Sequence, residues 1–257
     1  MLVSEQDIMQ FINQYYLPFI RIGAMFMVAP IFSARIVNAR LRLVLALVLG
    51  VIVAPLLPPM PSVPLFSLQS IALIVQEMLI GVVVGFVFQV VFQVFVLSGQ
   101  YMAMKMGLGF ASMNDPTNGV QTTVLSQFFL MLVTLMFIAI NGHLILISTV
   151  IDSFTTFPIG NALPAAALFD VVKLGGWMFA SALVIALPVL TALLFVNIAF
   201  GVMSRAAPQL NIFAVGFPFT LIMGLILIWL GLNGFVERFT NVADYGFLFI
   251  HDMLGVQ

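Results

Sequence analysis

Long, almost uncharged apolar runs recur along this chain and limit its possible folds more than any other feature. The run from Ile71 to Leu97 contains a single charged residue, Glu77. A helix of about 20 such residues crosses the hydrocarbon core of a bilayer, which is about 30 Å thick. The whole chain agrees, because 63% of its residues are hydrophobic and 7% are charged, against roughly 45–50% and 25% in soluble domains. The sequence therefore predicts an all-α membrane protein.

Six apolar blocks predict about six long helices, arranged in hairpins within a single membrane domain that covers residues 1–257. The blocks are Ile8–Phe32, Leu43–Leu57, Ile71–Leu97, about Val124–Ile151, Leu174–Phe200 and about Ile212–Val236. The first block is interrupted by Asn13, Gln14, Pro18 and Arg21. The second block ends at APLLPPMPSVP, where proline removes backbone donors and stops a helix. The N-terminal MLVSEQDIMQ has no basic residue before its apolar run, so we expect no cleaved leader.

Basic residues in the short connections predict an orientation. Arg35, Arg40 and Arg42 lie between the first and second blocks, Lys105 between the third and fourth, and Arg205 between the fifth and sixth. With six simple crossings, these three connections share one side of the membrane. The positive-inside rule makes that side cytoplasmic, and both termini then face outward.

A stripe of small and polar residues runs along the third block. It consists of Glu77, Gly81, Gly85, Gln89 and Gln93, spaced four apart, which places them on one face of an α-helix. Small residues four apart let another backbone approach closely, and a carboxylate is costly against lipid. We expect this face to meet protein or water, and a packed helix–helix seam is favoured over a hydrophilic conduit.

The sequence contains none of three common nucleotide-binding, zinc-protease and serine-hydrolase motifs. It has no phosphate-binding G-x-x-x-x-G-K-[ST], no H-E-x-x-H and no G-x-S-x-G. Its 2 histidines, His143 and His251, are too few for a zinc site, and its cysteine count is 0. We therefore expect no enzyme activity, no metal and no cofactor. The net charge of −1 also gives no attraction to nucleic acid.

His143 and Asp152 are two candidate ionisable residues in and just after the fourth block. His143, in the NGH of the fourth block, either relays protons or hydrogen-bonds a neighbouring helix, and we favour the hydrogen bond. Asp152 is interpreted as lying at the end of a helix near an interface.

Two function classes stay open. The chain is either a small-solute permease whose polar stripe lines its pathway, or a structural subunit of a membrane complex. Inverted repeats with matched helix breaks are typical of transporters, and Pro188 has no matching break, which favours the subunit.

Three stretches in order resemble a known family. GQYMAMKMGLGFASMNDPTNG, FIAINGHLILISTVIDSFTTFPIG and RAAPQLNIFAVGFP are similar to the family of the flagellar biosynthetic protein FliR and its injectisome counterpart SctT. Members of that family belong to the export gate of type III secretion systems. The NGHL form of the second stretch leans toward the flagellar branch.

The resemblance implies an assembly, partners and a location. FliR-like proteins assemble with FliP-like and FliQ-like subunits into a helical export gate, with an FlhB-like subunit associated, in the bacterial inner membrane within the flagellar basal body. Unfolded export substrates pass through that gate. Family gates sit largely above the bilayer plane, so the fold expected here is part of a helical assembly rather than a conventional lipid-exposed bundle.

The resemblance also divides the chain. It makes about residues 1–170 FliP-like and about residues 174–257 a FliQ-like helical hairpin. The connection Gly201–Asn211 joins the two arms of this hairpin and points to the cytoplasm. The connection residues singled out by this comparison are Arg205, Pro208, Gln209 and Asn211.

In the family, the segment after the third apolar block enters the central pore as a plug. Here that segment is 104–118, with Phe110 and Met113 as its apolar tip. The residues assigned to the plug are Met104, Met106, Gly107, Gly109, Phe110 and Met113. Methionine has three rotatable bonds and a polarisable sulfur, so it can seal against irregular surfaces, and glycine makes the backbone pliable. Lys105 lies at the pore entrance or anchors the helix end by snorkelling, and the entrance is favoured.

Overall fold

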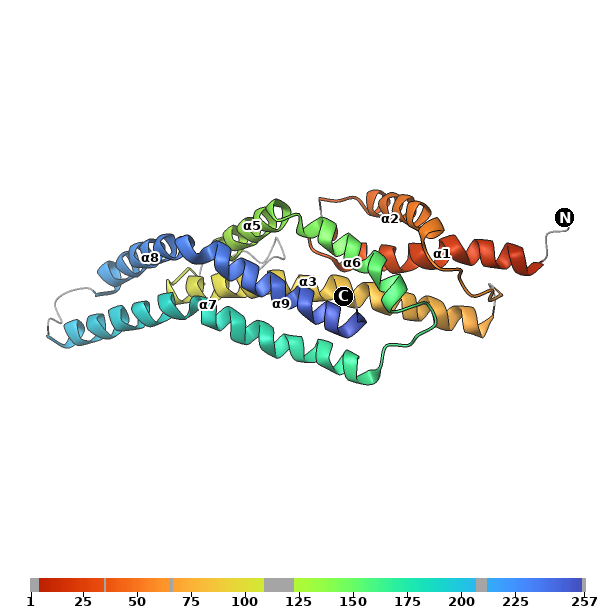
Figure 1. Ribbon diagram of the computed structural model, residues 1–257. Helices are drawn as coiled ribbons and strands as arrows, with labels where there is room; N and C mark the ends of the chain where they lie inside the picture. Colours follow the sequence, from red (N-terminus) through yellow and green to blue (C-terminus); the bar gives the residue numbers. More distant parts are fainter. Residues whose placement is uncertain (1–4, 35, 65–66, 109–122, 207–211, 256–257) are drawn as a thin grey trace. The chain divides into compact units, whose positions relative to one another are not determined.

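Every regular element in the described part of the chain is helical, which confirms the prediction of an all-α membrane protein (Figure 1). The computed structural model describes residues 5–34, 36–64, 67–108, 123–206 and 212–255. The α-helices are α1 (Glu5–Val28), α2 (Ala39–Val53), α3 (Leu68–Lys105), α5 (Val124–Ala139), α6 (Gly142–Thr156), α7 (Ala165–Ala206), α8 (Ile212–Gly231) and α9 (Phe235–Leu254). Two short 3₁₀ helices, η1 (Ala54–Leu56) and η2 (Leu232–Gly234), follow α2 and α8.

Several helices are long and apolar enough to cross a membrane. Within the described residues there are 4 such spans, or up to 5 if the bent pair α5 and α6 counts as one. α3 has 38 residues and α7 has 42, which at 1.5 Å per residue makes them about 57 Å and about 63 Å long. Each is therefore about twice as long as the hydrocarbon core is thick.

In the described part of the chain, the fourth and sixth of the six expected blocks each include a further helix. The fourth block breaks into α5 and α6 because Asn141 adopts a left-handed backbone conformation, with φ of 56°, which asparagine tolerates better than most residues. The sixth block does not end at Val236, since the chain continues as α9. That helix is amphipathic: Phe239 and Ile250 are buried, whereas Asp244 is exposed, so a search for uninterrupted apolar runs does not find it.

The third and fifth blocks are longer than expected. α3 continues to Lys105, so Met104 and Lys105 belong to its last turn. α7 begins at Ala165, before the expected start of the fifth block at Leu174. Three alanines open this helix, and alanine has the highest helix propensity of all residues.

The chain divides into two compact units, and each is discontinuous in sequence. Unit 1 comprises Met1–Val90, Phe137–Leu174 and Ala243–Gln257, and unit 2 comprises Val91–Met136 and Gly175–Val242. The division of the sequence into FliP-like and FliQ-like parts stays a prediction.

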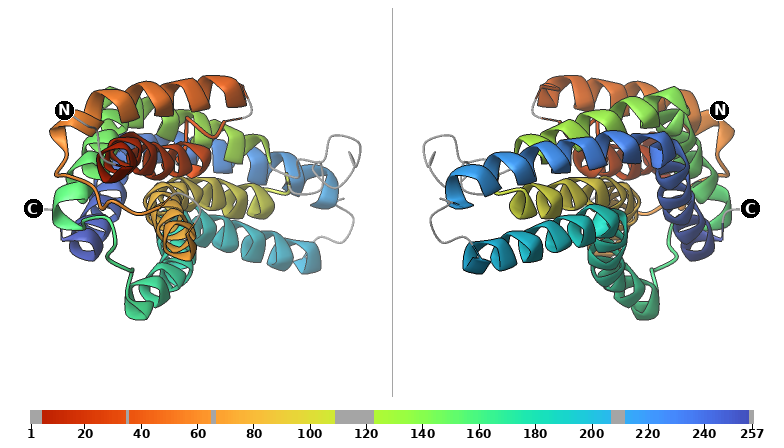
Figure 2. Two further views of the ribbon diagram at one scale, coloured as in Figure 1. Left: turned by 90° about the vertical axis from the view of Figure 1, so that its right-hand side faces the viewer. Right: turned by 90° about the vertical axis from the view of Figure 1, so that its left-hand side faces the viewer.

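In unit 1, α1 packs against α2 side by side (Figures 1 and 2). The polar residues that interrupt α1 hold the proline-rich segment after η1. Asn13 Nδ2 donates to Pro61 O at 2.9 Å and to Val63 O at 3.0 Å. Gln14 Nε2 donates to Ala54 O at 2.7 Å, and its Oε1 accepts from Met60 N at 3.0 Å. These two side chains therefore replace the helical bonds that the prolines prevent.

The core of unit 2 is an aromatic cluster. Phe95 of α3 packs against Phe235 and Phe239 of α9, with ring centroids 5.4 and 5.9 Å apart. Phe129 of α5 packs against the same Phe235. Gly99 lets α5 approach α3 closely, because an added Cβ there would lie 2.8 Å from the ring of Phe129. The second half of α3 therefore forms part of the core of unit 2.

Candidate functional site

Arg21 and Glu77 form a buried ion pair that links α1 to α3 inside unit 1. Arg21 Nε donates to Glu77 Oε2 at 2.6 Å, and Nη2 donates to Oε1 at 3.1 Å. Arg21 Nη1 donates to Ser153 Oγ at 2.9 Å, and both Nη atoms donate to Phe157 O at 3.3 Å. These bonds use all five N–H groups of the guanidinium. Arg21 therefore ties α1, α3 and the end of α6 together.

The surroundings of this ion pair leave it no contact with solvent. The two side chains are 0% and 1% exposed. The guanidinium carbon also lies 4.2 Å from the centre of the Phe154 ring, a distance that allows a favourable cation–π interaction. A buried pair adds little net stability over apolar residues of the same size, but loss of one partner is costly. The pair therefore specifies how these elements meet.

Sequence reasoning missed the role of Arg21, which was treated only as an interruption of the first block. A signal was available. The first apolar block from Ile8 holds one charged residue, Arg21, and the third holds one, Glu77. Charges inside apolar spans pair with one another in most cases, so two isolated charges of opposite sign are natural partners.

The predicted stripe on α3 meets α1 at its two glycines. A Cβ added at Gly81 would contact Arg21 O and would lie 2.9 Å from Ala24 Cβ. A Cβ added at Gly85 would lie 2.9 Å from both Met25 O and Ala29 N. Only glycine allows the backbones of α1 and α3 to lie this close.

The other stripe residues differ in their surroundings. Glu77 is fully buried in the ion pair one turn before Gly81. Gln89 and Gln93 are half-buried, and they fall in different units, Gln89 in unit 1 and Gln93 in unit 2. Whether these glutamines face a conduit or another subunit stays a prediction.

The described start of the methionine-rich segment is anchored on α8 within unit 2. Met106 is fully buried, and a Cβ added at Gly224 of α8 would lie 2.6 Å from its Cγ. Gly107 has φ of +84°, a left-handed conformation that favours glycine, and an added Cβ would meet the ring of Phe217 at 2.8 Å. Met106 and Gly107 therefore pack closely against α8.

Only some of the remaining residues assigned to the plug and to the hairpin connection lie in the described part of the chain. Met104 is 62% exposed and Lys105 is half-buried. Arg205 is exposed in the last turn of α7. The residues that lie outside the described part of the chain are Gly109, Phe110, Met113, Pro208, Gln209 and Asn211.

The two open ionisable candidates have different environments. Asp152 is exposed near the end of α6. His143 directly follows the break before α6, and its Nδ1 is buried without a hydrogen-bond partner among the described residues. The described residues also contain no cluster of three or more histidine, aspartate or glutamate side chains that could hold a metal ion.

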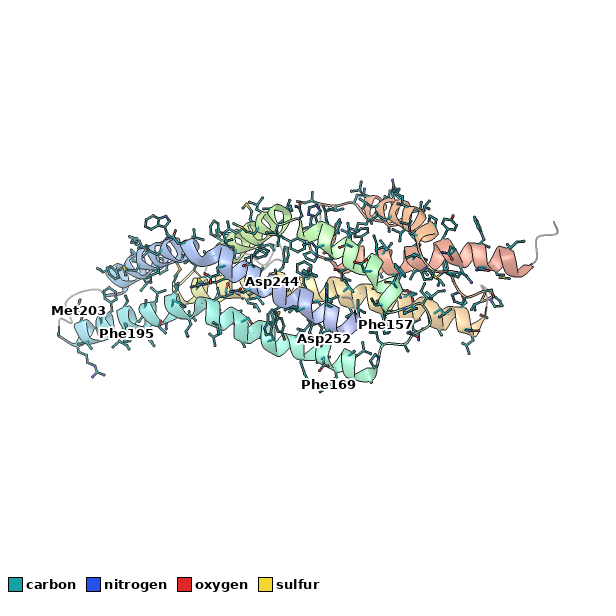
Figure 3. All side chains as sticks on the ribbon, viewed as in Figure 1. Phe157, Phe169, Phe195, Met203, Asp244 and Asp252 are labelled. Carbon is teal, nitrogen blue, oxygen red and sulfur yellow. The ribbon has the colours of Figure 1, made fainter. Side chains whose placement is uncertain are left out.

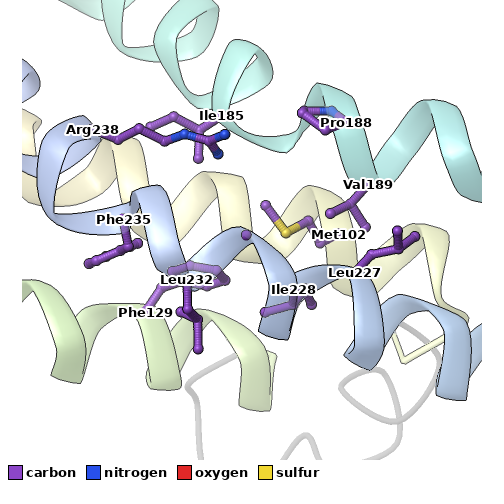
Figure 4. Close-up of a pocket in the computed structure, with 11 residues that line it drawn as sticks. Met102, Phe129, Ile185, Pro188, Val189, Leu227, Ile228, Leu232, Phe235 and Arg238 are labelled. Carbon is purple, nitrogen blue, oxygen red and sulfur yellow. The ribbon is translucent and has the colours of Figure 1, made fainter.

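A small cavity of about 60 Å³ lies inside unit 2 (Figure 4). Its walls come from Met102 of α3, Phe129 of α5, Pro188 of α7 and Ile228 of α8. Arg238 of α9 is the charged residue among those that line it. A volume of this size holds no more than a few water molecules, so it is not a solute-binding site.

Large apolar side chains cover the outside of α7 and α8. Phe195 and Met203 project from α7 (Figure 3), and Phe195 is 71% exposed. Trp229 on α8 is 69% exposed. Only 28% of the most apolar part of α7 is buried within the chain, compared with 72% for α3. In the working protein these faces require a cover of lipid or of other subunits.

Comparison with known proteins places the chain in a family. Residues 12–245 match the model of the bacterial export proteins, family 1. The flagellar biosynthetic protein FliR of Escherichia coli (strain K12) is 40% identical over 226 residues, which cover 88% of this chain and 86% of that protein. FliR of Pectobacterium carotovorum is 38% identical over 225 residues, which cover 87% and 86%.

A third relative extends the similarity over nearly the whole chain. FliR of Buchnera aphidicola subsp. Acyrthosiphon pisum is 34% identical over 244 residues, which cover 95% of this chain and 94% of that protein. The chain therefore belongs to family 1 of the bacterial export proteins, as a relative of the flagellar biosynthetic proteins FliR.

Proposed function

We propose that this chain is a non-enzymatic subunit of the flagellar type III protein export gate in the bacterial inner membrane. The observation that carries the proposal is its similarity to FliR proteins over most of its length. Such a chain belongs to the flagellar export apparatus, and its role is to complete a ring with FliP-like and FliQ-like subunits, next to an FlhB-like subunit.

The surface of the chain supports assembly with other subunits. α7 and α8 leave large apolar residues such as Phe195 and Trp229 uncovered. α7 is also about twice as long as the bilayer core is thick. Lipid alone cannot cover an apolar helix over that length, so part of its surface is free to pack against sister subunits.

Within the gate, the methionine-rich segment after α3 seals the pore for unfolded export substrates. Met106 and Gly107 support this role, because they fix the start of the segment on α8. A seal in this position has to hold back ions, since the driving force is about 2.3 kcal/mol per charge per 100 mV.

Assembly is tested by extracting the tagged chain from membranes in mild detergent. A gate subunit is expected to elute as a large hetero-oligomer that contains FliP-like and FliQ-like subunits. Elution as a monomer or small homo-oligomer would refute the assembly and would favour a small-solute permease.

The seal is tested separately in the assembled gate. Deletion of Gly107–Met113 is expected to raise the ion conductance of the gate, whereas replacement of Ser204 by alanine, at a half-buried site on α7, is the control and leaves it unchanged. Normal assembly with unchanged conductance after the deletion would remove the sealing role and leave the assembly proposal standing.

A further inference from the structure

A long apolar groove runs between α1 and α2 on the surface of unit 1. It consists of two adjoining cavities of about 490 and about 400 Å³, and Phe19 lines both. From Phe11 to Met27, α1 contributes one or two lining residues per turn, and Leu43 and Leu47 of α2 face them. Sixteen residues of helix at 1.5 Å each make the groove about 24 Å long. We call it the α1–α2 groove.

The groove is lined mainly by apolar side chains and lies beside an exposed helix. α2 and the adjoining η1 form one of the candidate membrane spans, and only 22% of that span is buried within the chain. The floor of the groove is close-packed, since a Cβ added at Gly50 would lie 3.3 Å from Phe19 Cα. α1 and α2 are therefore in close backbone contact beside the groove.

One end of the groove carries positive charge. Arg42 lines this end, and its Nη2 is fixed by hydrogen bonds to Val37 O at 2.9 Å and Ala34 O at 3.0 Å. Its Nε is buried and has no hydrogen-bond partner among the described residues. Arg40 is exposed two residues earlier, in the first turn of α2, and this first turn contains no acidic residue.

This arrangement is complementary to an amphipathic anion. The N-terminus of α2 adds its partial positive charge to that of the two arginines. The whole groove, about 24 Å long and mostly apolar, exceeds the hydrocarbon depth of one leaflet, which is about 15 Å. The basic end is also the end that the positive-inside rule places at the cytoplasmic surface.

We propose that the α1–α2 groove binds a phospholipid of the cytoplasmic leaflet, with an acyl chain along the groove and the headgroup phosphate at Arg42 and Arg40. A packed helix from a sister subunit would fill the apolar wall equally well, but it would need its own acidic residue to match the arginines. The lipid site does not depend on the export role, so either proposal can fail without the other.

The experiment places a photo-crosslinking residue at Leu47, which lines the groove and is 49% exposed, in the full chain assembled in cell membranes. The crosslinked product is identified by mass spectrometry. A phospholipid adduct is the expected result. A polypeptide adduct in its place would overturn the proposal and show that a sister subunit fills the groove.

Charge and shape variants distinguish a specific site from general lipid contact. Arg40→Gln removes an exposed charge that forms no ion pair in the described part of the chain, and we expect it to lower the lipid adduct about fivefold. Gly23→Leu is expected to fill the groove with little strain, because a Cβ there meets only Ala46 Cβ at 3.7 Å. Lys173→Gln, at an exposed ion pair with Asp170, is the matched charge control. An adduct equal in all three variants would refute a specific site.

Discussion

Replacement of Gly81 by alanine is the most direct test of the close packing between α1 and α3. The added methyl group would contact Arg21 O, and it would lie 2.9 Å from Ala24 Cβ and 3.0 Å from Met25 N. Two of these three atoms belong to the backbone of α1, so no side-chain rotation can relieve the contact. We therefore expect α1 and α3 to move apart, which also stretches the 2.6 Å bond between Arg21 and Glu77.

The expected magnitude follows from two opposing effects. Glycine to alanine inside a helix stabilises it by roughly 0.5–1 kcal/mol, because the unfolded chain loses conformational freedom. Insertion of a methyl group into a packed seam costs about 1–3 kcal/mol. Gly201→Ala in α7 is the matched control, because nothing lies within 4 Å of an added Cβ there. Gly81→Ala should therefore be less stable than Gly201→Ala by about 1–3 kcal/mol.

Stability is measured on the full chain in mild-detergent micelles, as resistance to unfolding during titration with a denaturing detergent. Because Gly81 contacts α1 of the same chain, we expect the loss to be visible in the isolated chain before any partner is added. Equal unfolding midpoints for Gly81→Ala and Gly201→Ala would refute the reasoning that this glycine is required for close approach.

Two further predictions concern side chains that the fold brings together. Arg21→Met leaves Glu77 buried and unpaired and should lower the free energy of unfolding by about 3–5 kcal/mol. The double variant Arg21→Met with Glu77→Leu should recover most of that loss. A double variant as unstable as the single one in the same detergent titration would contradict this account. Gly224→Ala should destabilise the chain because the new methyl group meets Met106 at 2.6 Å. Met106→Ala should also destabilise it, because Met106 is fully buried and its truncation leaves a cavity, but the double variant should lose less stability than the two single losses added together. Absence of coupling between the two in a double-mutant cycle would show that they do not share this contact.

Hydropathy predicted the helices that contain long stretches without a charged residue, and it failed where charged and apolar residues alternate. α3 and α7 could be located from composition alone, because most of the length of each helix has no charged residue. α9 has exposed Glu237, Asp244 and Asp252 on one face, so its average hydropathy does not mark it as a span, and its helical periodicity was the signal to use. The break between α5 and α6 depends on the backbone of Asn141, which no average over neighbouring residues can show.

The candidate site was predictable by residue type but not by partner. The spacing of Gly81 and Gly85 indicated a face that another backbone approaches, yet nothing in that spacing says that the backbone belongs to α1. Likewise, Arg21 and Glu77 are 56 residues apart in sequence. Their pairing becomes necessary only when both lie inside apolar helices, where neither charge has water to solvate it.

The ion pair and the glycines act on the same seam, and this explains why α3 is largely buried while α7 is not. Glu77 fixes α3 against Arg21, and the glycine one turn later, Gly81, brings the backbone of α3 against the carbonyl of that same arginine. The register of α1 on α3 is therefore specified twice, once by charge and once by shape. α7 has no comparable device at its glycines, because nothing lies within 4 Å of an added Cβ at Gly175, Gly176 or Gly201. A helix that leaves most of its apolar surface uncovered by its own chain remains available for contacts that the chain alone cannot supply.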